Sequence, residues 1–219
     1  MLEKQCKMWE NIGATESQES IMKYINQLEY PHIPYRTYAK IDTVSEADKM
    51  KSVSRSGCGP CSTCMAVELL TDKSLDIAEC IKISEECGAN HSRGTDMTVL
   101  GPVIADMFGL EYSYTNDLSE AVEHLRCGGK IVVHVTIPEP GKLGLFTKGG
   151  HYMLLDSTDG KDFCIIDPSY TPEKFHIPER EGRVDDSHAP YLYCDINTVH
   201  AETKVSDRYP KYHVFRRNR

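Results

Sequence analysis

A chain of 219 residues, 40% hydrophobic and 26% charged, is long enough to bury one sizeable core, and we expect a single domain over residues 1–219. Its formal charge of −8 and pI near 5.6 disfavour non-specific binding to a phosphate backbone, so no nucleic-acid partner is expected. No run approaches the roughly 20 apolar residues of a membrane span, and the first residues hold no apolar stretch of signal-peptide length. These features predict a cytoplasmic protein with no membrane partner.

The cysteine count bears on the redox state of the thiols. There are nine cysteines, an odd number, and no export signal precedes them. This usage favours reduced thiols over a disulfide framework. A nucleophilic thiol would therefore be chemically available.

The predicted elements change from helices to strands along the chain. The first part favours a helix over 17–28, an extended segment over 34–38 and a short helix over 45–50. Further helices are predicted over 58–70, 74–87, 96–108 and 117–127, and Gly88 and Gly109 are typical of left-handed helix stops. Short β-prone runs follow at 131–137, 151–156, 163–167 and 213–215. The order predicts an α+β fold, helical over about 1–128 and sheet over about 129–219.

Cys58 follows a polar turn and begins the helix predicted over 58–70. Free N–H groups and a partial positive charge at a helix N-terminus lower a thiol pKa from about 8.5 toward neutral values. The same amides, including that of Cys58, could receive an oxyanion formed during acyl transfer. The position predicts a nucleophilic thiolate.

Two other chemistries are compatible with this cysteine. Cys58 to Cys61 reads Cys-Gly-Pro-Cys, the string of thioredoxin-type redox sites, but residues 51–56 are too polar for the buried strand that precedes such a site. Cys58, Cys61 and Cys64 could bind a metal, yet they fall on one helical segment without a second cysteine pair at zinc-ribbon distance. We predict no metal and no cofactor, and expect Cys64, Cys80 and Cys164 to be small buried residues.

His151 and Asp167 lie on two β-prone runs that flank residues 158–160, Thr-Asp-Gly, a strong hairpin turn signal. If these three residues form the loop, with Gly160 left-handed, His151 stands opposite Asp167 with Cβ atoms about 4.5 to 5.5 Å apart. A one-residue slip would turn Asp167 to the opposite face of the sheet. The predicted register therefore decides whether the two side chains meet.

Cys58, His151 and Asp167 together predict a catalytic triad. His151 would take or share the thiol proton, and Asp167 would fix the ring so that the correct nitrogen faces the thiol. The thiolate would attack a carbonyl, and water or another acceptor would resolve the acyl-enzyme. Two glycines before His151 would let a substrate backbone approach the base. For His151 alone, the alternative is an ordinary strand-end histidine satisfied by a carboxylate.

Three short motifs resemble the papain-like cysteine peptidase superfamily: 56–60, 150–152 and 167–168. They are most similar to the bacteriocin-processing (double-glycine) peptidases, and the residues that lead to the histidine, 146–151, are similar to those of the soluble relatives of these peptidases. The resemblance covers roughly 34–167. It implies a papain-like α+β fold with Cys58 as nucleophile, His151 as base and Asp167 as orienter. Phytochelatin synthase resembles the chain less closely.

One position departs from that pattern. Such enzymes usually place a glutamine upstream of the cysteine to complete the oxyanion hole, and between Tyr30 and Cys58 there is none. Tyr38 falls about where the glutamine would and has a phenolic donor, although a half-buried strand aromatic is an equal interpretation. Because loss of one oxyanion donor costs about 10²- to 10³-fold in rate, weak activity or a different substrate is compatible with the sequence.

The sequence thus predicts a cysteine hydrolase that cleaves a peptide or related amide bond, with a peptide or acyl-amide as substrate. The alternatives are a dithiol redox protein using Cys58 and Cys61, and a catalytically silent binding module on the same fold. Residues 90–96 and 138–148 are glycine- and polar-rich and are candidate rim loops. No function is assigned to residues 168–219.

Overall fold

The computed structural model describes residues 22–35, 51–91, 94–139, 141–203 and 210–218. Among these residues, seven strands form one antiparallel sheet in the order β3-β9-β4-β5-β6-β8-β7. The strands are β3 (Leu110–Thr115), β4 (Lys130–Thr136), β5 (Gly150–Thr158), β6 (Asp162–Ile166), β7 (Asp185–His188), β8 (Tyr191–Asp195) and β9 (Tyr212–Arg217). A separate pair joins β1 (Asn90–His91) to β2 (Gly94–Thr95).

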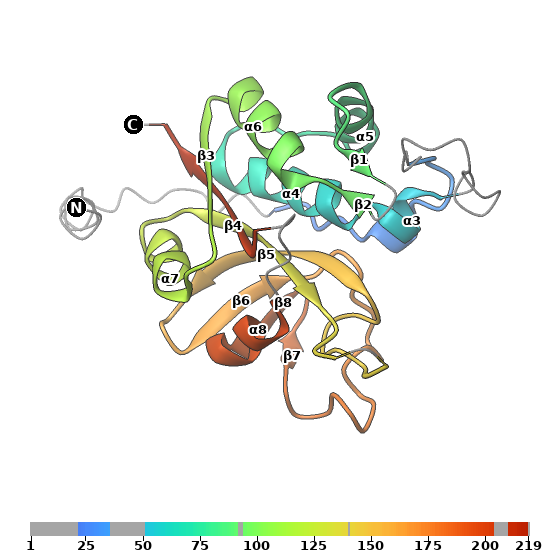
Figure 1. Ribbon diagram of the computed structural model, residues 1–219, viewed down its shortest axis with the longest axis vertical. Coiled ribbons are helices and arrows are strands. Elements are labelled where there is room, and N and C mark those ends of the chain that lie inside the picture. Colours follow the sequence, from blue (N-terminus) through green and yellow to red (C-terminus); the bar gives the residue numbers. More distant parts are fainter. Residues whose placement is uncertain (1–21, 36–50, 92–93, 140, 204–209, 219) are drawn as a thin grey trace.

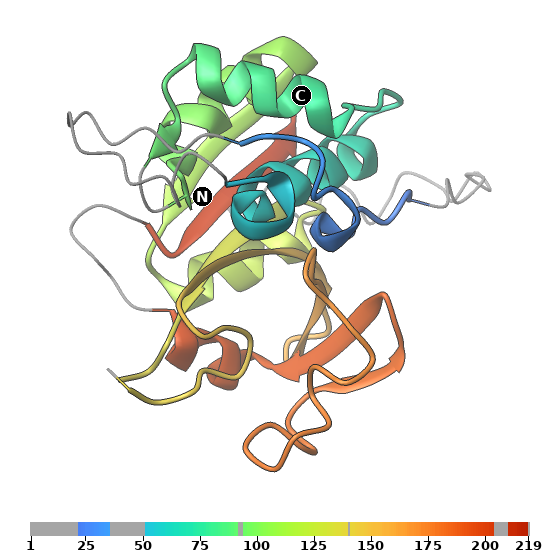
Figure 2. The same cartoon turned by 90° about the vertical axis from the view of Figure 1, so that its right-hand side faces the viewer.

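Helices cover both faces of the seven-stranded sheet (Figure 1). They are α3 (Val53–Ser56), α4 (Cys58–Leu70), α5 (Ile77–Glu86), α6 (Met97–Phe108), α7 (Leu118–Arg126) and α8 (Ile196–Glu202), and a 3₁₀ turn, η1, spans Gln27–Glu29. Helices α4, α5 and α6 lie on one face, and α7 and α8 lie on the other. Figure 2 shows the molecule from the side, with the green helices α5 and α6 at the top and the orange strands β7 and β8 in the lower half.

The alternation of side chains along the central strands explains why both faces are apolar. Leu154 on β5 and Ile166 on β6 belong to the core under α4 to α6, whereas Met153 and Ile165 belong to the core under α7 and α8. Successive residues of a strand point to opposite faces, so a sheet with helices on both sides needs apolar residues at nearly every position. This is why β5 and β6 read as continuous apolar runs.

Capping residues fix the helices that the sequence predicted over 74–87, 96–108 and 117–127. Asp76, Asp96 and Asp117 each precede a helix, and each side chain accepts a hydrogen bond from a backbone N–H of the first turn. Gly109 ends α6 in the left-handed region at φ 67°, and Gly88 follows α5 at φ 75°. These helices are confirmed with boundaries shifted by at most three residues.

Other predictions need correction. Residues 22–26 are not helical, and only η1 lies in the described part of the helix predicted over 17–28. The segment is instead held to a distant loop, because the backbone N–H of Gln27 donates to the carbonyl of Pro168 at 2.7 Å. The short helix predicted over 45–50 and residues 36–38 of the extended segment lie outside the described residues. Pro34, within that segment, forms an antiparallel bridge with Ser52.

The division into a helical first part and a sheet second part is also too simple. Strand β3 falls within the part expected to be helical and pairs with β9 from the far end of the chain. Helix α8 falls within the part expected to be sheet, where β7 and β8 were not predicted either. Pairing across about 100 residues leaves no local pattern in the sequence.

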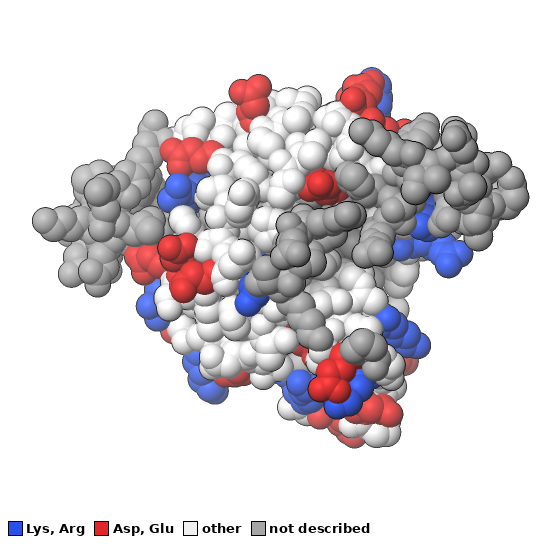
Figure 3. All heavy atoms as spheres, in the orientation of Figure 1, with Lys and Arg blue, Asp and Glu red and all other residues white. Residues whose placement is uncertain are grey.

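Charged side chains are dispersed on the face of the molecule shown in Figure 3. Lysine, arginine, aspartate and glutamate lie mostly near its edge in small groups of both signs, and uncharged atoms fill much of its centre. In the part of the chain that the structure describes, no helix has the length and apolar character needed to cross a membrane.

Candidate active site

Cys58 is the first residue of α4, which begins directly after α3. Gly57 joins the two helices, and a Cβ at that position would lie 2.6 Å from Val53 Cγ1 and 2.7 Å from its carbonyl oxygen, so the turn requires glycine. The carbonyl of Gly57 accepts the N–H of Cys61 at 2.9 Å, and Pro60 occupies the first turn, where its missing N–H is not needed. The sequence prediction that the thiol lies at a helix start is confirmed.

The surroundings of Cys58 favour the thiolate. Cys58 is half-buried, and burial raises the pKa of its thiol. A hydrogen bond and the charge of His151, together with the backbone N–H groups of Tyr152 and Gly59, outweigh burial and bring the pKa below its ordinary value. The His151 ring therefore stabilises the negative form of the thiol.

His151 connects this thiol to Asp167. His151 lies near the start of β5 and is buried, and its Nε2 lies 2.8 Å from Oδ1 of Asp167. Since Nε2 is held by Asp167, Nδ1 is the ring nitrogen that remains for Cys58. Burial lowers the pKa of His151, but the charge of Asp167 and hydrogen bonds to Asp167 and Cys58 raise it overall. The three residues predicted from the sequence are thus close together.

The register that joins them differs from the prediction. Leu155 pairs with Ile165, whereas the three-residue loop predicted Phe163 at that position. Thr158 pairs with Phe163 across a longer turn in which Asp159 Oδ1 accepts the N–H groups of Lys161 and Asp162, both at 2.7 Å. Gly160 is left-handed at φ 92°, as predicted. His151 and Asp167 are therefore not directly opposite.

A β-bulge at Asp156 puts Asp167 on the correct face. If the pairing at the turn continued without a shift, Asp167 would lie opposite Leu154, whose side chain enters the core under α4 to α6. The register shifts between Leu155 and Ser157, so that continuing the ladder past Ile166 sets Asp167 opposite Met153. Met153 and His151 share a face, and Asp167 becomes the diagonal neighbour of His151.

Lys130 holds the bulge in place. Its Nζ lies 2.6 Å from Oδ1 of Asp156 and 2.9 Å from the Asp156 carbonyl oxygen. Both side chains are less than one-fifth exposed. The extra residue of β5 is therefore bound through side chain and backbone to the neighbouring strand.

Asp167 is completely buried and is held from several sides. Ser169 donates its backbone N–H to Oδ1 at 2.8 Å, and Lys174 Nζ donates to Oδ2 at 2.5 Å. Burial raises the pKa of this carboxyl group, but the charges of Lys174 and His151 and their hydrogen bonds lower it well below its ordinary value. The hydroxyl of Tyr24 donates to the Asp167 carbonyl at 2.7 Å. The carboxylate is thus ionised and fixed in orientation.

Ser169, Lys174 and Tyr24 were not predicted from the sequence. The turn formed by Asp167 and Ser169 carries a signal, since an aspartate before proline commonly accepts the N–H two residues on. Lys174 lies in an irregular loop after β6 and has no periodic pattern. Tyr24 comes from a segment that the sequence assigned to a helix.

The other cysteines differ in environment from Cys58. Cys61 is fully buried, and burial with the charges of nearby thiols raises its pKa well above the ordinary value. This disfavours a reactive dithiol pair, because the second thiol is neither accessible nor acidic. Cys64, Cys80 and Cys164 are buried, as predicted. No group of three or more potential ligands suited to a metal ion occurs among the residues described.

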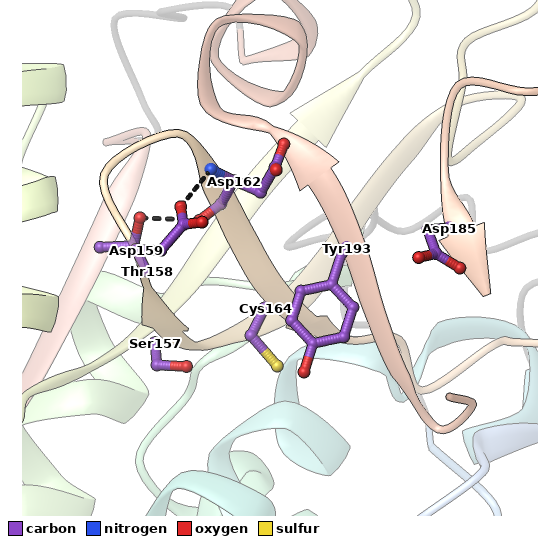
Figure 4. Close-up of a pocket in the computed structure, with 7 residues that line it drawn as sticks. All are labelled: Ser157, Thr158, Asp159, Asp162, Cys164, Asp185 and Tyr193. Carbon is purple, nitrogen blue, oxygen red and sulfur yellow. Dashed lines mark hydrogen bonds between the residues drawn. The ribbon is translucent and has the colours of Figure 1, made fainter. Parts of the chain in front are cut away.

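One sequence prediction and one cavity lie apart from this cluster. Tyr38, the candidate oxyanion donor, lies outside the described residues. A cavity of about 420 Å³ is found near the turn of the β5–β6 hairpin, away from His151, and Figure 4 shows the side chains around it. Its lining residues are Ser157, Thr158, Asp159, Asp162, Cys164, Asp185 and Tyr193. None of them belongs to the cluster around Cys58.

Comparison with known proteins supports the fold. No profile of a protein family and no curated protein matches the chain. Among solved structures, the chain is similar to a Bacillus anthracis protein described as a "putative C39-like peptidase". The TM-score is 0.53 at 11% sequence identity, over 91% of this chain and 96% of the other. At this identity the likeness shows a shared fold, in agreement with the α+β prediction.

Proposed function

We propose that this protein is a cysteine hydrolase of papain-like fold that cleaves a peptide or related amide bond. Cys58 is the nucleophile, His151 the general base and acid, and Asp167 the residue that orients the ring. The observation that carries the proposal is the position of His151, which is hydrogen-bonded to Asp167 at 2.8 Å and to the thiol at the start of α4. A structural neighbour described as a peptidase supports the same assignment.

The chemistry follows from the charges of the cluster. The thiol proton passes to Nδ1 of His151, which leaves a thiolate beside an imidazolium. The thiolate sulfur bonds to the substrate carbonyl carbon, and the backbone N–H groups at the start of α4 stabilise the negative oxygen. When the C–N bond breaks, the imidazolium gives its proton to the leaving amine. Water, deprotonated by His151, then cleaves the thioester and restores the thiol.

Asp167 supports this cycle by its fixed position. A carboxylate at Nε2 selects the tautomer that presents Nδ1 to the thiol and stabilises the imidazolium once it forms. Because Asp167 is fully buried, its charge acts on the ring with little screening by solvent. Ser169 donates its backbone N–H to Oδ1 of the same carboxylate, which restricts its rotation.

Turnover by wild-type protein and the Cys58→Ser variant, measured on peptide and acyl-amide libraries, tests the proposal. The wild type should release an amine product and form a thioester adduct on Cys58, detectable by mass spectrometry after rapid acid quench. Cys58→Ser should lose both, while Cys127→Ser, which changes another half-buried cysteine, should retain them. A wild-type protein that binds peptides but neither forms the adduct nor turns over would be a silent binding module, contrary to the proposal.

A further inference from the structure

Lys174 is a buried cation at the far side of the candidate site. Its side chain is 9% exposed, and its Nζ lies 2.5 Å from Oδ2 of Asp167 and 2.8 Å from Ser169 Oγ. Ser169 Oγ in turn lies 3.2 Å from His151 Nε2. The ammonium group is therefore one carboxylate away from the imidazole ring.

The chain holds this lysine in place by its backbone. The N–H of Lys174 donates to the Thr171 carbonyl at 3.0 Å, and the carbonyl of Lys174 accepts from Nη1 of the buried Arg180 at 3.1 Å. Arg180 Nε also donates to the Gly144 carbonyl at 3.0 Å, which ties the loop to the segment before β5. Burying a charged side chain in a fixed position costs free energy unless its partner charge is held beside it.

The charge count explains what the lysine does to the ring. A thiolate, an imidazolium and the Asp167 carboxylate alone sum to one negative charge in a buried cluster, and the lysine brings that sum to zero. Without the ammonium, the full charge of the carboxylate would act on His151 and strengthen its hold on the proton. An imidazolium that is too weak an acid is slow to protonate a leaving amine.

We propose that Lys174 is a positioning residue that acts through Asp167: it fixes the second carboxylate oxygen and offsets the charge of the carboxylate, so that His151 can both take up and release its proton. The inference rests on the proposed function for its catalytic meaning. The effect on His151 itself is independent of any substrate.

Other groups around His151 and Asp167 also contribute to this balance. The thiol of Cys58 and the carboxylate favour the charged ring, whereas Lys174 and burial oppose it. His134 on β4 is close enough to feel the charge of His151, and burial lowers its own pKa to about 4, so it is neutral at pH 7. Arg180 and Tyr24 feel the charge of Asp167. Lys174 makes an ion pair with the carboxylate, beside the His151 ring on its other oxygen.

Titration of the His151 ring by NMR tests the inference in the full-length protein. Wild type is compared with Lys174→Met and Lys174→Gln, which remove the charge, and with Lys174→Arg, which retains it. Glutamine keeps an N–H donor for Oδ2, so it separates loss of charge from loss of a hydrogen bond. Lys142→Met removes an exposed lysine paired with Glu139 and serves as the control.

The titration midpoint of His151 should move to higher pH by about one unit in both uncharged variants, as expected for one charge within ~4–6 Å. Lys174→Arg and Lys142→Met should leave it in place. The alkaline limb of any turnover should move in the same direction. An unchanged or lowered midpoint in folded Met and Gln variants would overturn the inference, and so would unfolding of both beside a folded Arg variant, which assigns the lysine to stability alone.

This design separates the two proposals. The ring titration needs no turnover, so it decides the role of Lys174 even if Cys58→Ser behaves like wild type. Conversely, thioester formation at Cys58 with an unmoved midpoint would support the proposed function and remove the role of Lys174.

Discussion

His151 and Asp167 are joined by a 2.8 Å hydrogen bond although the strand ladder makes them diagonal, not opposite, neighbours. The bulge at Asp156 takes one extra residue of β5 out of the ladder, and this shift of register keeps the two side chains on one face of the sheet. A bulge of this kind re-aims the side chains beyond it without changing the fold. The candidate site therefore depends on a feature of the backbone as well as on three side chains.

Deleting Asp156 should remove the bulge and keep the pair together. Ser157 pairs with Cys164 and Leu155 with Ile165, so loss of the residue between them leaves a regular ladder in which Met153 still stands opposite Asp167. We expect the deletion variant and Asp156→Gly, which keeps the residue count, both to retain the coupling between His151 and Asp167 in NMR titrations. Loss of that coupling in a folded deletion variant would contradict the assignment of Asp156 as the extra residue.

Asp167→Asn should destabilise the fold at pH 7 by about 3–5 kcal/mol, because it leaves the buried Lys174 charge without its partner. The folded-state pKa of Asp167 lies below the ordinary value of 3.8, so its contribution is present above that pH and is lost as the pH falls through the folded-state value. Urea denaturation of the wild type and the variant at pH 7 measures the loss of stability, and the same comparison at about pH 3 measures its dependence on pH.

Glu139→Gln is the matched control for that experiment. Glu139 and Lys142 approach each other to 2.8 Å, the same separation as His151 and Asp167, but both side chains are more than 60% exposed. An exposed pair contributes about 0–1 kcal/mol, so the control should change the free energy of unfolding little. Equal losses of unfolding free energy in Asp167→Asn and Glu139→Gln would show that burial of Asp167 does not strengthen its contribution to stability.

The rate of turnover should have a bell-shaped dependence on pH. The pKa of Cys58 lies below its ordinary 9.0 and that of His151 above its ordinary 6.5, and both shifts favour a thiolate–imidazolium pair between two macroscopic values. Turnover should rise as the thiol loses its proton and fall as the imidazolium loses its own. Initial rates from about pH 4 to pH 10 check this. A rate that climbs continuously through pH 9 would indicate an unassisted thiol.

Gly149→Ala should affect turnover more than stability. A Cβ at Gly149 would meet nothing within 4 Å, so the free energy of unfolding should change by no more than about 0.5 kcal/mol. If a substrate backbone passes beside the glycines before His151, the added methyl group should raise KM. Gly141→Ala is an unsuitable control because Gly141 has φ 81°, whereas Lys148→Ala changes the preceding residue without adding bulk. Unchanged KM in Gly149→Ala would remove this path for the substrate.

The sequence was sufficient for the features that arise locally. A glycine, a cysteine and a proline within one turn specify the start of α4, and two apolar runs around Thr-Asp-Gly specify the β5–β6 hairpin. The hairpin prediction correctly put His151 and Asp167 on the same face of the sheet, although the predicted pairing was wrong by two residues. A longer turn and a bulge changed the register together. Neither the longer turn nor the bulge can be recognised from the sequence, because Asp156 is an ordinary residue within a β-prone run.

Long-range features were out of reach. Strand β9 lies between β3 and β4 in the sheet, and no local pattern in its residues specifies that place. Lys174 belongs to an irregular loop, so its burial beside Asp167 becomes visible only once the loop is folded against the hairpin. A lysine is exposed in most proteins, which is why sequence reasoning had no ground for placing it beside the site.

Alkylation of the cysteines by iodoacetamide, followed by mass spectrometry of each thiol at neutral pH, tests the thiol–imidazole–carboxylate cluster most directly. Cys58 should react fastest, and His151→Ala should slow it about tenfold or more, because an unassisted thiol is only a few per cent thiolate. His176→Ala removes an exposed histidine paired with Asp186 at 3.1 Å and should have no effect. Alkylation of Cys58 no faster than that of the half-buried Cys87 and Cys127, or unaffected by His151→Ala, would contradict the account.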